Sequence, residues 1–135
     1  MSSVFIDTSA FLALLDADDE HHPRAATAWS EILAGDTQLV TSNYILVETF
    51  ALVQNRLGME AVRVFQEDIV PLLAIQWVNA ATHAGATSAL LAAGRKRLSL
   101  VDCSSFEVMR QAGIKRVFTL DRHFKEQGFT CLPQV

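Results

Sequence analysis

Near its amino terminus the chain reads SVFIDTSAFLALL over residues 3–15. The β-prone residues 3–6 predict a short strand, because such side chains fit a pleated, buried surface. Asp7, Thr8 and Ser9 follow at once and are good helix-capping residues, and the apolar residues after them predict a helix. The stretch therefore predicts a strand, a turn and a helix, the unit from which parallel α/β sheets are built.

The same alternation continues along the chain. Further strands are predicted at residues 38–41, 75–78, 116–120 and 130–132. Further helices are predicted at residues 23–34, 43–57, 59–74, 80–94 and within 101–112, and Pro71 interrupts the helix at 59–74. A short helix is predicted before the last strand. Strands that alternate with helical crossovers predict a three-layer α/β/α fold, with a central parallel sheet flanked by helices.

Length and composition agree with one globular domain. The 135 residues suffice for a single core, so we expect residues 1–135 to form one domain. Half of the residues are hydrophobic and 19% are charged, which excludes a disordered or low-complexity chain. The longest apolar run, residues 10–15, is far shorter than the roughly 20 residues that cross a bilayer, and no basic start marks a secretory signal. We expect no membrane segment and a cytoplasmic location.

Charge is divided unevenly along the chain. The net charge of −4 argues against a simple, basic nucleic-acid binder. However, residues 1–90 carry a net charge of −8 and residues 91–135 a net charge of +4. A cationic portion can still meet a polyanion, because phosphate attraction acts within a Debye length of about 8 Å. Charge alone leaves both a phosphate-binding face and an ordinary solvated surface open.

Two aspartates follow predicted strands. In open α/β sheets, functional sites form outside the carboxyl ends of the strands. Asp7 and Asp121 each occupy such an end. Each could instead cap the helix after it, so neither alone indicates a site.

Two further carboxylates lack local cations. Glu48 lies in an apolar predicted helix, and the residues three and four positions away from it carry no charge. Burying an unpaired carboxylate costs several kcal/mol, so a group outside the helix must compensate it. Asp102 also lacks a local cation. Capping is the alternative role for Asp102, but Ser104 and Glu107 form an equally good capping box that would leave Asp102 available.

These four carboxylates would repel one another if they met. Mg²⁺ or Mn²⁺, which prefer oxygen ligands, are the usual remedy, so the cluster predicts a metal site. Two such ions about 4 Å apart stabilise the attacking and leaving oxygens of a phosphodiester displacement. The carboxylates therefore predict metal-dependent hydrolysis of nucleic acid.

The motifs also carry a resemblance to a known family. They are FIDTS at residues 5–9, Glu48 in its apolar helix, SLVD at residues 99–102 with Ser105 after it, and TLDRHF at residues 119–124. In this order and spacing they resemble a PIN domain, and most closely the VapC-type toxin ribonucleases. The resemblance covers nearly the whole chain, from residue 4 to residue 129.

The resemblance implies roles for individual residues. It implies a catalytic and metal-binding quartet of Asp7, Glu48, Asp102 and Asp121. It implies supporting polar positions at Ser9, Ser105 and Thr119. It further implies an endoribonuclease that uses Mg²⁺ or Mn²⁺ and leaves 5′-phosphate and 3′-hydroxyl ends. Such a toxin is expected to form a homodimer and to be silenced by a cognate antitoxin.

An RNA substrate would need cations near the carboxylates. The cationic candidates for phosphate contacts near Asp102 and Asp121 are Arg122 as the first choice, and Arg95, Lys96, Arg97, Lys115 and Arg116.

An antitoxin would need an apolar surface. Two predicted helices carry many large apolar residues, which are Trp29, Ile32 and Leu33 on one, and Leu46, Phe50 and Val53 on the other. They predict either a groove for an amphipathic partner helix or packing into one core, and the sequence leaves both open.

Other functions have weaker support. No GxGxxG or GxxxxGK[ST] motif occurs, so no nucleotide cofactor is expected. His123 is interpreted as an exposed helix residue, because two-metal chemistry needs no histidine base. An aspartyl phosphotransfer domain would also place Asp7 after the first strand, but it gives Glu48 and Asp102 no role. A non-catalytic module that binds RNA or protein remains the alternative to an enzyme.

Overall fold

The computed structural model describes residues 2–134. They contain a five-stranded sheet in the order β3-β2-β1-β4-β5, and every pair of neighbouring strands is parallel. In chain order the strands are β1 (Ser2–Ile6), β2 (Thr37–Ser42), β3 (Ala74–Gln76), β4 (Arg116–Phe118) and β5 (Thr130–Leu132). The carboxyl ends of all five strands therefore lie at one edge of the sheet.

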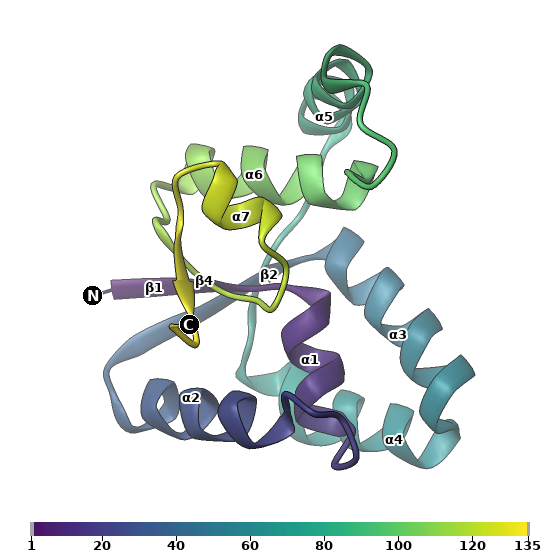
Figure 1. Cartoon of the computed structure of the whole chain (residues 1–135), viewed down its shortest axis with the longest axis vertical. Helices are drawn as coiled ribbons and strands as arrows, with labels where there is room; N and C mark the ends of the chain where they lie inside the picture. The colour runs from purple at the N-terminus through teal and green to yellow at the C-terminus, as the bar shows by residue number, and fades with distance from the viewer. Residues whose placement is uncertain (1, 135) are drawn as a thin grey trace.

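Helices cover both faces of this sheet. They are α1 (Thr8–Leu15), α2 (His22–Ala34), α3 (Asn43–Leu57), α4 (Met59–Val64), α5 (Ala80–Ala93), α6 (Leu100–Ala112) and α7 (His123–Glu126). Figure 1 shows α2 and α4 below the strands and α6 and α7 above them, while α5 lies against α6. The predicted three-layer α/β/α fold is confirmed. No helix in residues 2–134 is both long and apolar enough to span a membrane.

The core is built around β1. Val4, Phe5 and Ile6 have no exposed surface, as expected of a central strand covered on both faces. Below the sheet, Phe11 and Phe50 each pack edge-on against Phe65 with ring centroids 5.0 Å apart. This packing fixes α1 and α3 next to each other, and both helices begin at the carboxyl edge of the sheet.

The large apolar residues of α2 and α3 mostly join this core, so of the two alternatives left open by the sequence, the structure supports packing into the core. Ile32 and Val53 are buried, and Trp29 stacks on Phe118 with ring centroids 6.4 Å apart. Leu33 is the exception, with 46% of its surface exposed.

Most predicted bounds agree with the structure to within one residue, and three elements differ more. The predicted helix at 59–74 divides into α4, a π-helical turn (Phe65–Ile69) and a 3₁₀ turn (Val70–Leu72) that contains Pro71, which cannot donate a helical hydrogen bond. The predicted strand at 75–78 is β3, one residue earlier and shorter. The predicted strand at 116–120 ends at Phe118, because the backbone N–H groups of Leu120 and Asp121 donate to side chains of the site described next.

Candidate active site

Asp7 lies directly after β1, and its buried carboxylate is held by two hydroxyl groups. Ser9 Oγ donates to Asp7 Oδ2 at 2.8 Å, and Thr119 Oγ1 donates to the same oxygen at 2.9 Å. Each hydroxyl also accepts a backbone N–H, Ser9 from Leu120 and Thr119 from Asp121, both at 2.9 Å. Within the described residues Asp7 makes no side-chain capping bond to α1, so its capping alternative is wrong.

The pKa of Asp7 is raised to about 6. Burial is the main cause, because it disfavours the charged form of the carboxyl group. The hydrogen bonds from Ser9 and Thr119 oppose the rise, and the negative charges of Asp102 and Asp121 add to it. The structure therefore brings three of the four predicted carboxylates close enough to act on one another.

Asp102 lies in the first turn of α6 and does cap it. The backbone N–H of Asp102 donates to Ser99 Oγ, and the N–H of Ser99 donates to Asp102 Oδ2, both at 3.0 Å. The predicted alternative box with Ser104 and Glu107 is wrong, because Ser104 Oγ donates to the Val101 carbonyl oxygen at 2.7 Å. Burial raises the pKa of Asp102 and the capping bonds oppose that rise. The cap thus fixes the orientation of this carboxylate.

Asp121 and His123 complete the cluster. Asp121 Oδ1 accepts the backbone N–H of His123, the first residue of α7, at 2.9 Å, although Arg122 and not Asp121 holds the N-cap position of that helix. His123 Nδ1 lies 2.9 Å from Asp121 Oδ1 and 3.7 Å from Asp102 Oδ2. One ligand atom from each of these three residues lies within 4.8 Å of the others. Only 14% of the His123 side chain is exposed, so its interpretation as an exposed helix residue is wrong.

Glu48 is not one of the three residues of this cluster, and neither is Asp7. Glu48 is partly exposed on α3, and its carboxylate is outside the group of three residues within 4.8 Å. Water can therefore solvate it, and the premise that burial demands a partner does not hold. Its neighbour Thr49 is buried and donates to Thr8 Oγ1 of α1 at 3.5 Å. Glu48 thus lies on a helix that is tied to the first turn after Asp7.

The donor set fits a divalent cation. Asp7, Asp102 and Asp121 offer carboxylate oxygens, the donors that Mg²⁺ and Mn²⁺ prefer. Two buried polar atoms, His123 Nδ1 and Ser105 Oγ, have no hydrogen-bond partner among the described residues. Unsatisfied polar atoms beside mutually repelling carboxylates are expected where a cation binds. Ser105 lies three residues after Asp102 on α6 and is buried, and its supporting role stays a prediction.

Four of the cationic candidates are exposed near the segments that carry Asp102 and Asp121. Arg95, Lys96 and Arg97 are exposed on the segment that leads into α6, and Arg122 is exposed beside Asp121. Arg95 is partly committed, because its Nη1 lies 2.9 Å from Glu126 Oε2 of α7.

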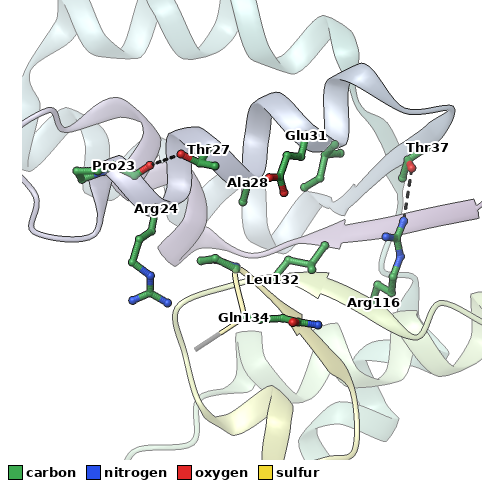
Figure 2. A pocket seen from close by; sticks show the side chains of 11 residues that line it. Pro23, Arg24, Thr27, Ala28, Glu31, Thr37, Arg116, Leu132 and Gln134 are labelled. Atoms are coloured by element: carbon green, nitrogen blue, oxygen red, sulfur yellow. Dashed lines mark hydrogen bonds between the residues drawn. The ribbon is translucent and has the colours of Figure 1, made fainter.

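Arg116 lies at the opposite edge of the sheet. It begins β4, and its Nη2 is 3.4 Å from Thr37 Oγ1 at the start of β2. Figure 2 shows it lining a pocket of about 650 Å³ between α2 and the end of β5. Apart from Arg116, this pocket contains none of the predicted site residues. The expectation that Arg116 lies near Asp102 and Asp121 is wrong, and Lys115 precedes it at the same amino end of β4.

The raised pKa of Asp7 predicts a pH-dependent stability. Well below its ordinary pKa of 3.8 the carboxyl is protonated in both the folded and the unfolded protein, so it has no effect on stability there. Above its folded pKa of about 6, ionised Asp7 destabilises the fold by up to about 3 kcal/mol. In metal-free protein, Asp7→Asn should therefore raise the free energy of unfolding at pH 7.5 and leave it nearly unchanged at about pH 3. Urea unfolding in EDTA measures both values.

The exposed residue Asp36 supplies the matched control. Asp36→Asn should change the unfolding free energy by less than about 0.5 kcal/mol at either pH. An Asp7→Asn protein that is less stable than wild type at pH 7.5 would contradict the electrostatic account of this carboxyl.

Comparison with known proteins agrees with this geometry. The family model of the PIN domain matches residues 4–129. The chain is 32% identical over 127 residues to the 23S rRNA-specific endonuclease VapC20 of Mycobacterium tuberculosis H37Rv, across 93% of this chain and 95% of the relative. The crystal structure of that VapC20, described as a sarcin–ricin loop cleaving toxin, matches with a TM-score of 0.84 at 30% identity, over 94% of this chain and 96% of that one.

More distant structures share the fold. FitAcB from Neisseria gonorrhoeae matches with a TM-score of 0.68 at 19% identity, over 95% of each chain. DNA-bound VapBC from Salmonella typhimurium matches with a TM-score of 0.68 at 15% identity, over 97% of each chain. Because the family model and the mycobacterial relative both span almost the whole chain, this protein belongs to the PIN domain family.

Proposed function

We propose that this protein is a metal-dependent endoribonuclease and the toxin of a toxin–antitoxin pair. The observation that carries the proposal is the convergence of Asp7, Asp102 and Asp121 at the carboxyl edge of a PIN-domain sheet. The name of the mycobacterial relative, an endonuclease specific for 23S rRNA, supports RNA as the substrate class.

In this proposal the protein positions charge for hydrolysis. A bound Mg²⁺ or Mn²⁺ ion would activate water and stabilise negative charge on the scissile phosphate. Asp7, Asp102 and Asp121 would hold the ion, and Glu48 would complete the quartet from α3. Ser9 and Thr119 keep the Asp7 carboxylate in one orientation through Oδ2. The capping box does the same for Asp102.

The proposal predicts the response of RNA cleavage to metal and to mutation. With Mg²⁺ or Mn²⁺ the protein should cleave RNA in a panel that includes 23S rRNA, and excess EDTA should stop it. Asp7→Asn should lower the rate at least about a thousandfold, because it removes about 4 kcal/mol of charge stabilisation while keeping the side-chain shape. Asp102→Asn should act similarly, and the exposed Asp36→Asn should cleave like wild type.

These assays separate the alternative functions. RNA binding without cleavage at any metal would favour a non-catalytic module, and acyl-phosphate trapping on Asp7 would favour phosphotransfer. Unchanged turnover in Asp7→Asn would contradict the proposed nuclease site.

We further propose that Arg122, Arg95, Lys96 and Arg97 contact RNA phosphates. The support is their exposure on the two segments that carry Asp102 and Asp121. Each phosphate contact releases counterions, so its loss weakens binding of every RNA sequence and reduces the salt dependence.

The double variant Lys96→Gln, Arg97→Gln should lower the slope of log affinity against log salt by about 1 to 2. Binding is measured by fluorescence anisotropy in the inactive Asp7→Asn protein. Lys115→Gln, at the opposite edge of the sheet, is the matched control and should leave the slope unchanged. An unaltered slope in the double variant would assign Lys96 and Arg97 to the ordinary solvated surface.

The proposed partners are a cognate antitoxin and a second copy of the chain, with action in the cytoplasm. Their support is the description of the mycobacterial relative as a toxin. Overexpression should arrest growth, and co-expression of a small protein from the adjacent reading frame should restore growth and co-purify with the chain. Light scattering should give a dimer. A harmless monomer that recovers no partner would contradict the toxin proposal and leave the nuclease proposal standing.

A further inference from the structure

We propose that His123 is a metal ligand: its Nδ1 atom, together with the carboxylates of Asp102 and Asp121, forms a mixed nitrogen and oxygen site. Such a site favours a transition-metal ion such as Mn²⁺ over Mg²⁺. This inference rests on the proposed function, because it assigns a further ligand to the same metal site.

The position of the imidazole carries the inference. His123 Nδ1 lies 2.9 Å from Asp121 Oδ1 and 3.7 Å from Asp102 Oδ2, so it faces two carboxylates from different elements. Its side chain is 14% exposed, and Nδ1 itself is buried. One atom from each of the three residues lies within 4.8 Å of the others, a spread that one ion can span.

The rival role is an ion pair in which His123 only steadies Asp121. The distance of 2.9 Å permits a contact, but Nδ1 makes no hydrogen bond of acceptable geometry within residues 2–134. Asp121 Oδ1 already accepts the backbone N–H of His123 at 2.9 Å. Burying the imidazole nitrogen beside carboxylate oxygens without a hydrogen bond between them costs free energy. A cation bound between the nitrogen and the carboxylates would remove this cost.

The imidazole is also held in place. His123 begins α7, and the next residue, Phe124, is fully buried. The ring of Phe124 packs edge-on against Phe106 of α6 with centroids 5.0 Å apart. Because Asp102 lies on α6, this contact fixes the distance between the imidazole and the Asp102 carboxylate. Ligands held by rigid packing lose little entropy on binding an ion.

The nitrogen should change which ion binds. Mg²⁺ demands oxygen ligands and keeps several waters, whereas transition-metal ions accept imidazole readily. The matched variants are His123→Asn, which places an amide atom at the position of Nδ1, and His123→Ala, which removes the donor. The control is His83→Asn, because His83 is exposed on α5 and bonds to Tyr44.

The test is electron spin-echo spectroscopy of the full chain with one equivalent of Mn²⁺, with and without ¹⁵N-labelled histidine. Wild type and His83→Asn should show nitrogen modulation that changes with the isotope. His123→Asn should still bind Mn²⁺ but show no such modulation. The ratio of Mn²⁺ to Mg²⁺ affinity, measured by calorimetry, should fall about tenfold or more in His123→Asn and in His123→Ala.

RNA cleavage by the same samples separates this inference from the proposed function. Wild type that binds Mn²⁺ and cleaves RNA but shows no histidine modulation would overturn the role of His123 and leave the nuclease intact. Modulation that persists in His123→Asn would also overturn it. Wild type that neither binds Mn²⁺ nor cleaves RNA would overturn both.

Discussion

The hydrogen bonds from Ser9 and Thr119 to the Asp7 carboxylate are the constraint on which the site depends. They reduce the cost of burying a carboxylate at the end of the central strand. The same hydroxyls accept the N–H groups of Leu120 and Asp121, so they end β4 and turn the chain after it. The start of α1 and the exit from β4 are thereby joined. This junction places Asp121 beside Asp7, although 114 positions separate them in the sequence.

The charges of the molecule are separated in a way that suits a phosphate substrate. Carboxylates gather inside, where Asp102 is only 12% exposed and Asp121 29%, while the nearby arginines and lysines lie outside. Arg95 pairs with Glu126 rather than with the cluster. No protein cation except His123, if protonated, contacts Asp102 or Asp121 among residues 2–134. Under the proposed function the negative interior would hold a metal ion and the positive exterior would contact RNA, which would reconcile the net charge of −4 with a nucleic-acid substrate.

The sequence predicts the strands, turns and helix caps that depend on neighbouring residues. Residues 3–15 form the expected strand, turn and helix, and Ser42 caps α3 by accepting the N–H of Ile45 at 3.2 Å. The sequence does not predict which residues cap α6, because both Ser99 with Asp102 and Ser104 with Glu107 fit the pattern of a capping box. The structure uses Ser99 with Asp102. The burial of His123 depends on how Phe124 packs against α6, and a helix of four residues shows no periodicity. The exposure of Glu48 and the contact between Tyr44 and His83 are likewise set by tertiary packing.

We infer that Asp7, Asp102 and Asp121 together hold a divalent cation. Anomalous diffraction from crystals soaked in MnCl₂ tests it directly, because the signal locates manganese without reference to activity. We expect a peak within coordination distance of all three carboxylates in wild type, and its loss or clear weakening in Asp7→Asn. Manganese bound only at the acidic loop of residues 16–20, with these carboxylates unchanged, would contradict the account.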